Sequence, residues 1–277
     1  HQDDMGVELE IEFTAGIDYT PVLSFVKKKN NWVVDKDGSL RGVSYEFITP
    51  PADPTTHFNA FISFEEELER TTGYSPRKLI TASHRTSTHV HLNFNKDGTM
   101  DTLKFIALYY LFEQVLIELA DADRKHNTFC VSSNTIPFLI SDNIVNKHHF
   151  SKGITDKDAN KYASLNFSRF LDLGTIESRI MHGYKNALAV SNWLCVLKDL
   201  KVSSRTRFKS LTDINNSFLN IPCTDFLAMV FPKSVDNILT QLKKKDRPLK
   251  EIIADGYRSA YAILQNAFIV EEGVAGV

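Results

Sequence analysis

The sequence predicts an α+β fold, with a β-sheet in residues 1–183 and a helical portion in residues 184–277. Three observations support this prediction. Charged and apolar residues alternate strictly near the start of the chain, which is typical of a half-buried strand. Further alternating segments follow, with Asp-Gly turn signals between them. After residue 184 the apolar spacing becomes helical, and we expect these helices to pack on the same domain as the sheet.

The first strand, GVELEIEF at residues 6–13, gives the two faces of the sheet different chemistry. Glu8, Glu10 and Glu12 point to one face because side chains alternate along a strand. At a rise of about 3.3 Å per residue, neighbouring carboxylates lie roughly 6.5–7 Å apart. Two explanations are open: a solvated edge strand that uses charge to prevent aggregation, or a carboxylate row that binds Mg²⁺ or Mn²⁺.

The remaining elements follow from periodicity and turn residues. Further strands are predicted at residues 32–34, 42–48, 86–94, 162–167 and 174–181. Helices are predicted at residues 57–72, 101–120, 134–145, 184–201, 211–221, 225–243 and 248–268. The polar segments 147–161 and 203–209 are predicted to be mobile loops. The first is a candidate lid, and the cations of the second either bind phosphate or are solvated.

Composition excludes several classes of protein. The 277 residues are 43% hydrophobic and 24% charged, an ordinary globular balance. A net charge of −2 gives no field that would recruit nucleic acid or an anionic membrane. Three separated cysteines without a C-x-x-C motif argue against a disulfide framework or zinc knuckle, so we expect a cytoplasmic protein. P-loop, dinucleotide-binding, G-x-S-x-G and H-E-x-x-H motifs are absent from the sequence.

The other predicted strands also carry polar side chains on one face. Glu46 lies on the strand that follows the first Asp-Gly turn, and His89 and His91 share one face of the next strand. Glu177 and Arg179 share one face of the last strand. Burying such rows under helices costs several kcal/mol per unpaired ion. A polar groove in which metal ions neutralise the glutamates avoids that cost.

Simpler explanations stay open for the individual residues. His89 and His91 either pack across strands or, with a glutamate, form a zinc site of His₂Glu type. In the simpler explanation for Arg179, this residue only forms an ion pair with Glu177, two residues away. Glu12 is either solvated or supports the site from behind.

Six motifs occur in one order along residues 6–179. They are GVELEIEF (6–13), DGSLRGVSYEFITPP (37–51), HVHLNF (89–94), RKHNTF (124–129), YASLNF (162–167) and GTIESR (174–179). Together they resemble the amidoligase family, carboxylate–amine ligases of the glutamine synthetase and glutamate–cysteine ligase superfamily. The helical portion from residue 184 carries no matching motif.

The resemblance implies a curved antiparallel sheet of glutamine synthetase-like catalytic type, with helices packed on its convex side. The concave face is then expected to bind ATP and two or more Mg²⁺ (or Mn²⁺) ions. The metal ligands that the resemblance implies are Glu8, Glu10, Glu46, His89 and Glu177. The nucleotide-binding residues that it implies are His89, His91, Arg179 and Asn166. The catalytic residues that it implies are Glu177, Arg179 for the transferring phosphoryl group, and Arg124 for a substrate carboxylate.

The function expected from this resemblance is ATP-dependent amide or peptide bond formation through an acyl phosphate. The substrates would be an amino acid or peptide and an amine acceptor, with neither membrane nor nucleic acid involved. Two alternatives are a divalent-metal phosphoesterase or nuclease that uses the same carboxylates, and a non-catalytic binding protein. Identity of the substrates and oligomeric state do not follow from the sequence.

Overall fold

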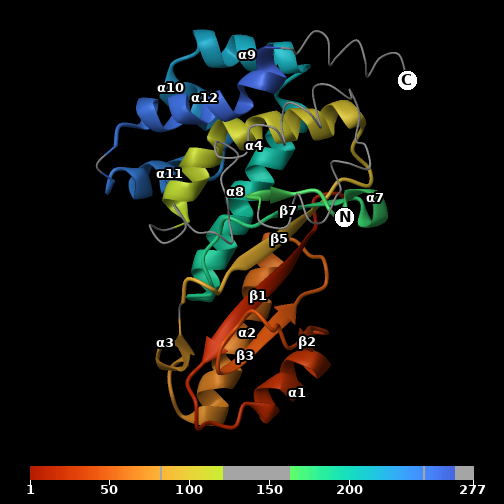
Figure 1. The fold of residues 1–277 in the computed structure, drawn as a ribbon, viewed down its shortest axis with the longest axis vertical. Coiled ribbons are helices and arrows are strands. Elements are labelled where there is room, and N and C mark those ends of the chain that lie inside the picture. Colours follow the sequence, from red (N-terminus) through yellow and green to blue (C-terminus); the bar gives the residue numbers. More distant parts are fainter. Residues whose placement is uncertain (82, 121–162, 246, 266–277) are drawn as a thin grey trace.

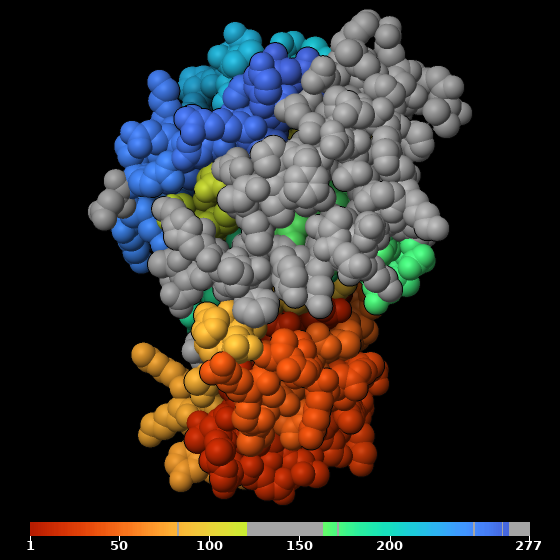
Figure 2. Space-filling model, viewed as in Figure 1, coloured from red at the N-terminus to blue at the C-terminus, as the bar shows by residue number. Residues whose placement is uncertain are grey.

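The computed structural model describes residues 1–81, 83–120, 163–245 and 247–265, which form one sheet with helices packed against it (Figure 1). These residues are the coloured ones in the space-filling view (Figure 2). The strands are β1 (Met5–Phe13), β2 (Val33–Asp35), β3 (Val43–Ile48), β4 (Ile80–Thr81), β5 (Thr88–Asn93), β6 (Leu165–Asn166) and β7 (Thr175–Ser178). The longer helices are α1 (Thr20–Lys29), α2 (Pro54–Thr72), α4 (Thr99–Leu119), α8 (Ala187–Thr206), α9 (Leu211–Asn220) and α12 (Leu249–Gln265). The shorter ones are α3 (Pro76–Leu79), α7 (Phe170–Leu173), α10 (Cys223–Val230) and α11 (Val235–Leu242).

Strand β1 lies inside the sheet. The strand order is β2-β3-β1-β5-β7-β6, β4 also pairs with β1, and every pairing among the described strands is antiparallel. The explanation of the glutamate row as a solvated edge strand is therefore wrong, because β1 has hydrogen-bonded neighbours on both sides. The predicted α+β class with an antiparallel sheet is confirmed.

The apolar face of β1 is covered by aromatic side chains. Val7, Leu9 and Ile11 are buried on this face. Phe47 of β3 packs against Phe64 of α2, with ring centroids 5.4 Å apart, within the range of favourable aromatic pairs. This packing holds α2 against the sheet and leaves the glutamate-bearing face of β1 turned away from it.

Helix α4 is the central helix of the upper part of the molecule in Figure 1 and is buried on nearly all sides. A helix that is apolar all round is stable only inside a protein, and α4 packs against α8, α9 and α12. Phe105 of α4 contacts Phe94 at the end of β5, with centroids 4.9 Å apart. The Tyr109 hydroxyl donates a hydrogen bond to the Ser164 carbonyl oxygen, 3.0 Å away, just before β6.

Glu65 ties α2 to the start of α8. Its Oε1 accepts hydrogen bonds from the Tyr184 hydroxyl (2.8 Å) and from the Ala187 backbone N–H (2.7 Å). Asn186 caps α8 by accepting from the Ala189 N–H, 2.8 Å away. The segment between β7 and α8 is thus fixed where it enters α8.

Several predicted elements differ from the structure. Residues 203–206 are not a loop but the last turn of α8, where Arg205 NH1 lies 3.1 Å from Asp3 and 3.2 Å from Asp97. The helical pattern predicted at 225–243, with Pro232 as an interruption, forms two helices, α10 and α11, because proline lacks the N–H that a continuous helix requires. Helices α1 and α3 and strand β4 were not predicted. The helix predicted at 134–145 and the lid at 147–161 lie outside the described residues.

No helix within the described ranges combines the length and apolar character needed to span a bilayer.

Gly256 lets α12 lie directly on α4, which gives a prediction. A Cβ at this position would lie 1.9 Å from the Leu111 carbonyl oxygen, a backbone atom that cannot turn away. Alanine normally stabilises a helix interior by about 1 kcal/mol over glycine. Here we expect Gly256→Ala to lower the free energy of unfolding by about 3 kcal/mol or more, because overpacking forces the helices apart.

Denaturant unfolding measures this effect, and Gly38→Ala is the control because a Cβ there meets nothing within 4 Å. Unchanged or increased stability of Gly256→Ala would contradict this prediction, because it would show that α12 lies farther from α4 than the structure indicates.

Candidate active site

The register of the sheet brings polar side chains of five strands to one face. Residues directly opposite each other in an antiparallel pair point to the same side. The opposed pairs are Glu10 with Glu46, Glu8 with His89, His91 with Glu177, and Asn166 with Glu177. We call the face formed by these seven residues the acidic face.

The first group of candidate metal ligands is Glu8, His89 and Glu177. One ligand atom from each lies within 4.8 Å of the others. His89 Nδ1 lies 3.1 Å from Glu177 Oε1 and 3.4 Å from Glu8 Oε2. His91 Nε2 contacts the other oxygen of Glu8 at 3.0 Å. His89 and Glu177 are buried, with 3% and 5% of their surface exposed.

The second group is Glu10, Asp37 and Glu46, whose carboxylate oxygens also lie within 4.8 Å of one another. Asp37 comes from the loop between β2 and β3. Burial, together with the negative charges of Glu8, Glu10 and Asp37, raises the pKa of Glu46 to about 7. Burial and these neighbouring negative charges together favour the protonated form of Glu46 up to near neutral pH.

Ser87 connects the two groups. Its backbone N–H donates to Glu10 Oε2 at 2.8 Å, and its hydroxyl donates to the same oxygen. The Ser87 hydroxyl also lies 2.6 Å from His89 Nε2. Glu10 and His89 are thereby oriented by one shared partner.

Hydrogen bonds compensate the charge of the first group. Burial raises the pKa of Glu8, but hydrogen bonds from His89 and His91 more than offset this and hold that pKa well below its usual range. Burial lowers the pKa of His91, yet its bond to Glu8 and the charge of Glu177 raise it overall. Glu177 accepts from Arg179 NH1 and from Asn166 Nδ2, each at 2.7 Å.

A β-bulge lies directly after Ser178. Val90 pairs with Ser178, and Ser87 pairs with His182. Ser87 is three positions before Val90, whereas His182 is four positions after Ser178. One extra residue is therefore accommodated between Ser178 and His182. Such bulges change the direction of side chains and are common beside active sites.

The sequence matches the family model described as "Putative amidoligase enzyme" over residues 23–200. The chain belongs to this amidoligase family. The match covers β3, β5 and β7 with their acidic-face residues and begins after β1. Family membership places the chain among carboxylate–amine ligases, which form carbon–nitrogen bonds.

Two solved structures are similar to this amidoligase. The GmaS/ADP complex is 12% identical with a TM-score of 0.45, covering 99% of this chain and 70% of that one. The complex between the prokaryotic ubiquitin-like protein Pup and its ligase PafA is 10% identical with a TM-score of 0.36, covering 96% of this chain and 65% of that one. Comparison with curated proteins gave no match.

The structure of the amidoligase brings most of the predicted site residues together. All seven residues of the acidic face were predicted, and Arg179 joins them through Glu177. Arg124 lies outside the described residues. Glu12 belongs to neither group of ligands, and its Oε1 accepts from the Arg41 N–H at 3.0 Å, so it holds the loop before β3.

Sequence reasoning missed Asp37 and Ser87. Asp37 was interpreted only as a turn residue, and its place beside Glu10 depends on how the β2–β3 loop returns to the sheet. Ser87 carries a signal that could have found it, because it lies two residues before His89 and so shares its face.

The residues of the acidic face fit divalent cations. Each group offers an oxygen-rich ligand set, with one imidazole in the first group, and hard oxygen ligands suit Mg²⁺ or Mn²⁺. The raised pKa of Glu46 is consistent with this, because it reflects burial together with negative charge that a bound cation would offset.

A cavity of about 360 Å³ opens from one end of the acidic face. Glu8 and His91 of the acidic face line it, Ile48, Pro51 and Leu173 provide apolar surface, and polar groups complete the lining. The remaining lining residues include Asp4, Thr49, Asn93, Asn95 and Thr175. The cavity therefore combines an apolar wall with access to the first group of ligands.

The repulsion around Glu46 predicts a pH dependence of stability in metal-free buffer containing EDTA. The folded-state pKa of Glu46 is about 7, above its ordinary value of 4.5, so the folded protein retains a proton that the unfolded chain releases. The stability that the protonated Glu46 contributes to the folded state is then fully present below about pH 4.5 and is lost as the pH rises through 7. We expect Glu46→Gln to lose less thermal stability over this range and to have the higher Tm at pH 8.

Thermal unfolding from pH 4.5 to 8 measures the difference, with Glu66→Gln on the exposed side of α2 as the matched control. A Glu46→Gln profile that runs parallel to that of the unmodified protein would contradict the proposed charge repulsion.

Proposed function

We propose that this amidoligase is an ATP-dependent carboxylate–amine ligase that acts through an acyl phosphate. An amino acid or peptide would supply the carboxylate, and a second substrate would supply the amine. The observation that supports this most is the pair of adjacent ligand groups on one buried sheet face, linked by Ser87 and flanked by Arg179. We further propose that residues 1–183 form the catalytic core and that the helices after residue 184 complete the same domain.

The proposed reaction concentrates negative charge. The γ-phosphoryl group moves from ATP to a carboxylate oxygen, giving ADP and an acyl phosphate, and the amine then displaces phosphate. Glu8, His89 and Glu177 would hold one divalent cation, and Glu10, Asp37 and Glu46 another. Bound cations would offset the charge of the phosphates and the carboxylate.

Arg179 is the proposed stabiliser of the transferring phosphoryl group. Its guanidinium is anchored by Glu177 at 2.7 Å, which holds it at the edge of the first ligand group. A planar guanidinium binds two phosphate oxygens at once, and it stays charged at every relevant pH. We propose that Arg124 binds the substrate carboxylate, as the family resemblance implies.

The cavity beside Glu8 and His91 is the proposed nucleotide site. Its volume of about 360 Å³ lies within the range of small-ligand pockets. Its apolar wall would contact the base, Asn93 and Asn95 would provide hydrogen bonds, and the phosphates would point to the acidic face. The buried positions of Glu10 and Glu177 also favour this chemistry, because an acyl phosphate must be kept from water.

Release of ADP tests this function. The full chain is incubated with ATP and Mg²⁺ against a panel of amino acids, peptides and amines. We expect ADP release that depends on a carboxylate substrate and that falls at least about 100-fold in Glu10→Gln, because a charge-stabilising group is lost. Glu12→Gln is the matched control on the same strand and should stay within about threefold.

ADP formed at the same rate without any carboxylate, or unchanged in Glu10→Gln, would overturn the proposal. Hydrolysis of a phosphodiester or nucleic acid by the same glutamates would favour a metal-dependent phosphoesterase instead. Absence of Mg-ATP binding in calorimetry would favour a non-catalytic protein.

Arg179→Lys separates positioning from charge. Lysine keeps the positive charge but cannot bind two phosphate oxygens in the geometry of a guanidinium. We expect kcat to fall by about 10²-fold with little change in KM for ATP, since the contact is proposed for the transition state. Steady-state kinetics measure the two constants, and a KM effect alone would place Arg179 in ground-state binding.

A further inference from the structure

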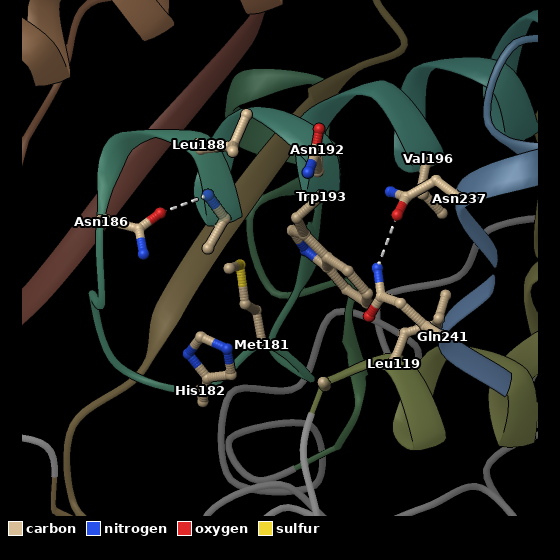
Figure 3. A pocket seen from close by; sticks show the side chains of 12 residues that line it. Leu119, Met181, His182, Asn186, Leu188, Asn192, Trp193, Val196, Asn237 and Gln241 are labelled. Atoms are coloured by element: carbon tan, nitrogen blue, oxygen red, sulfur yellow. Dashed lines mark hydrogen bonds between the residues drawn. The ribbon is translucent and has the colours of Figure 1, made fainter. Parts of the chain in front are cut away.

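A second cavity, of about 280 Å³, is lined by Met181 and His182, which follow β7, and by helical residues (Figure 3). It is enclosed by the end of α4, the segment after β7, the first half of α8, and α11. Met181 and His182 form one wall, and Trp193, Asn237 and Gln241 lie on the helical side. The proposed ATP-dependent chemistry uses none of these residues.

Trp193 gives this cavity an unsatisfied hydrogen-bond donor. The side chain is only 4% exposed, and its indole N–H has no partner within the part of the chain that the structure describes. Figure 3 shows the indole nitrogen on the edge of the ring turned toward Met181. A buried N–H without an acceptor is unfavourable, so the cavity favours a ligand that brings an acceptor oxygen.

The lining indicates an uncharged ligand. Among the described residues, no lysine, arginine, aspartate or glutamate lines the cavity, whereas three asparagines and one glutamine do. Asn186 Oδ1 is used by the cap of α8, and Gln241 Nε2 donates to Asn237 Oδ1 at 3.0 Å. These bonds leave the Asn186 Nδ2 donor and the Gln241 Oε1 acceptor for other partners. Among the described lining residues, His182 alone could supply a positive charge to a carboxylate or phosphate, whereas an amide offers both an acceptor and a donor that match the lining amides.

Apolar side chains accompany these amides. Leu188 is 60% exposed at the cavity, and Met181 is buried in its wall. The volume of about 280 Å³ is just below the usual range for whole small ligands, about 300–1,000 Å³. The size and the mixed lining suit one amino-acid residue with its flanking amide rather than a free cofactor.

The cavity lies close to the acidic face. His182 in its wall pairs with Ser87, and Ser87 donates to Glu10. A substrate that reaches from this cavity to the acidic face would therefore pass only the paired residues Ser87 and His182.

We propose that this cavity binds the amide-bearing part of a peptide substrate, with Trp193 N–H donating to a carbonyl oxygen. This inference rests on the proposed ligase function, because it makes one substrate a peptide or a blocked amino acid rather than a free one. The cavity is the specificity site, and the acidic face carries out the chemistry.

Tryptophan NMR tests the cavity without ATP or turnover. The chain has two tryptophans. Trp32 packs among Phe47, Phe61 and Phe64 and does not line the cavity, so its indole signal is an internal control. The full chain labelled with ¹⁵N at the indole nitrogens is titrated with N-acetylalanine methylamide up to about 20 mM. We expect a saturable shift of the Trp193 signal alone, and a smaller response to acetate or free alanine.

Two variants test which groups bind the probe. Trp193→Phe keeps an aromatic ring but removes the donor, and calorimetry should show affinity for the probe about five- to tenfold weaker. Gln241→Met removes the glutamine acceptor without adding charge and should also weaken binding, whereas Gln265→Met, at the end of α12, should not. Circular dichroism shows whether each variant has folded.

Three results would overturn the proposal: no shift of the Trp193 signal, equal shifts of both indole signals, or unchanged affinity in folded Trp193→Phe. Binding of the probe by a protein that forms no ADP would leave the cavity in place and reject the ligase function. Substrate-dependent ADP release without binding of the probe would support the ligase function and reject the cavity as a binding site.

Discussion

Repulsion among carboxylates on one sheet face is the constraint on which the arrangement of the surrounding strands and side chains depends. Glu8 is compensated by two histidines, Glu177 by Arg179 and Asn166, and Glu10 by Ser87. Glu46 is compensated least, and its pKa rises to about 7. Apart from Arg179, which lies two residues after Glu177, each compensating group comes from a neighbouring strand or loop. The face is therefore stable only when the strands are in this one register, since a shift of one residue would turn every side chain to the other side.

The opposite face of the sheet maintains that register. Val7, Leu9 and Ile11 alternate with the glutamates and are buried, so the packing of α2 and the position of the carboxylates are two consequences of one alternating pattern. Farther along the sheet, Phe94 and Tyr109 connect β5 and the segment before β6 to α4. Rigid helices behind the sheet thus position ligand atoms to within a few ångströms, which a metal or phosphate site needs.

The sequence predicted the acidic face well because alternation along a strand directly determines which side chains share a face. It predicted less where the answer depends on contacts between distant segments. Asp37 meets Glu10 through a loop, and the mobile loop expected at 203–209 is instead helical up to Thr206 because Arg205 pairs with Asp3 and Asp97. Helix α1 was missed because only Val22 and Val26 of its ten residues are buried, a weak periodic signal. The cavity at Trp193 joins segments from four parts of the chain, so no local pattern could indicate it.

The β-bulge after Ser178 separates two kinds of change in this enzyme. Before the bulge, Glu177 is fixed by strand pairing and by its contacts within the first ligand group, so substitutions there would alter the proposed metal site. After it, His182 and the start of α8 follow a shifted register and contact the second cavity. Residues of α8 and α11 can therefore diverge without moving a single carboxylate. On this proposal, a lineage with this fold could acquire new substrates while it keeps one inherited reaction.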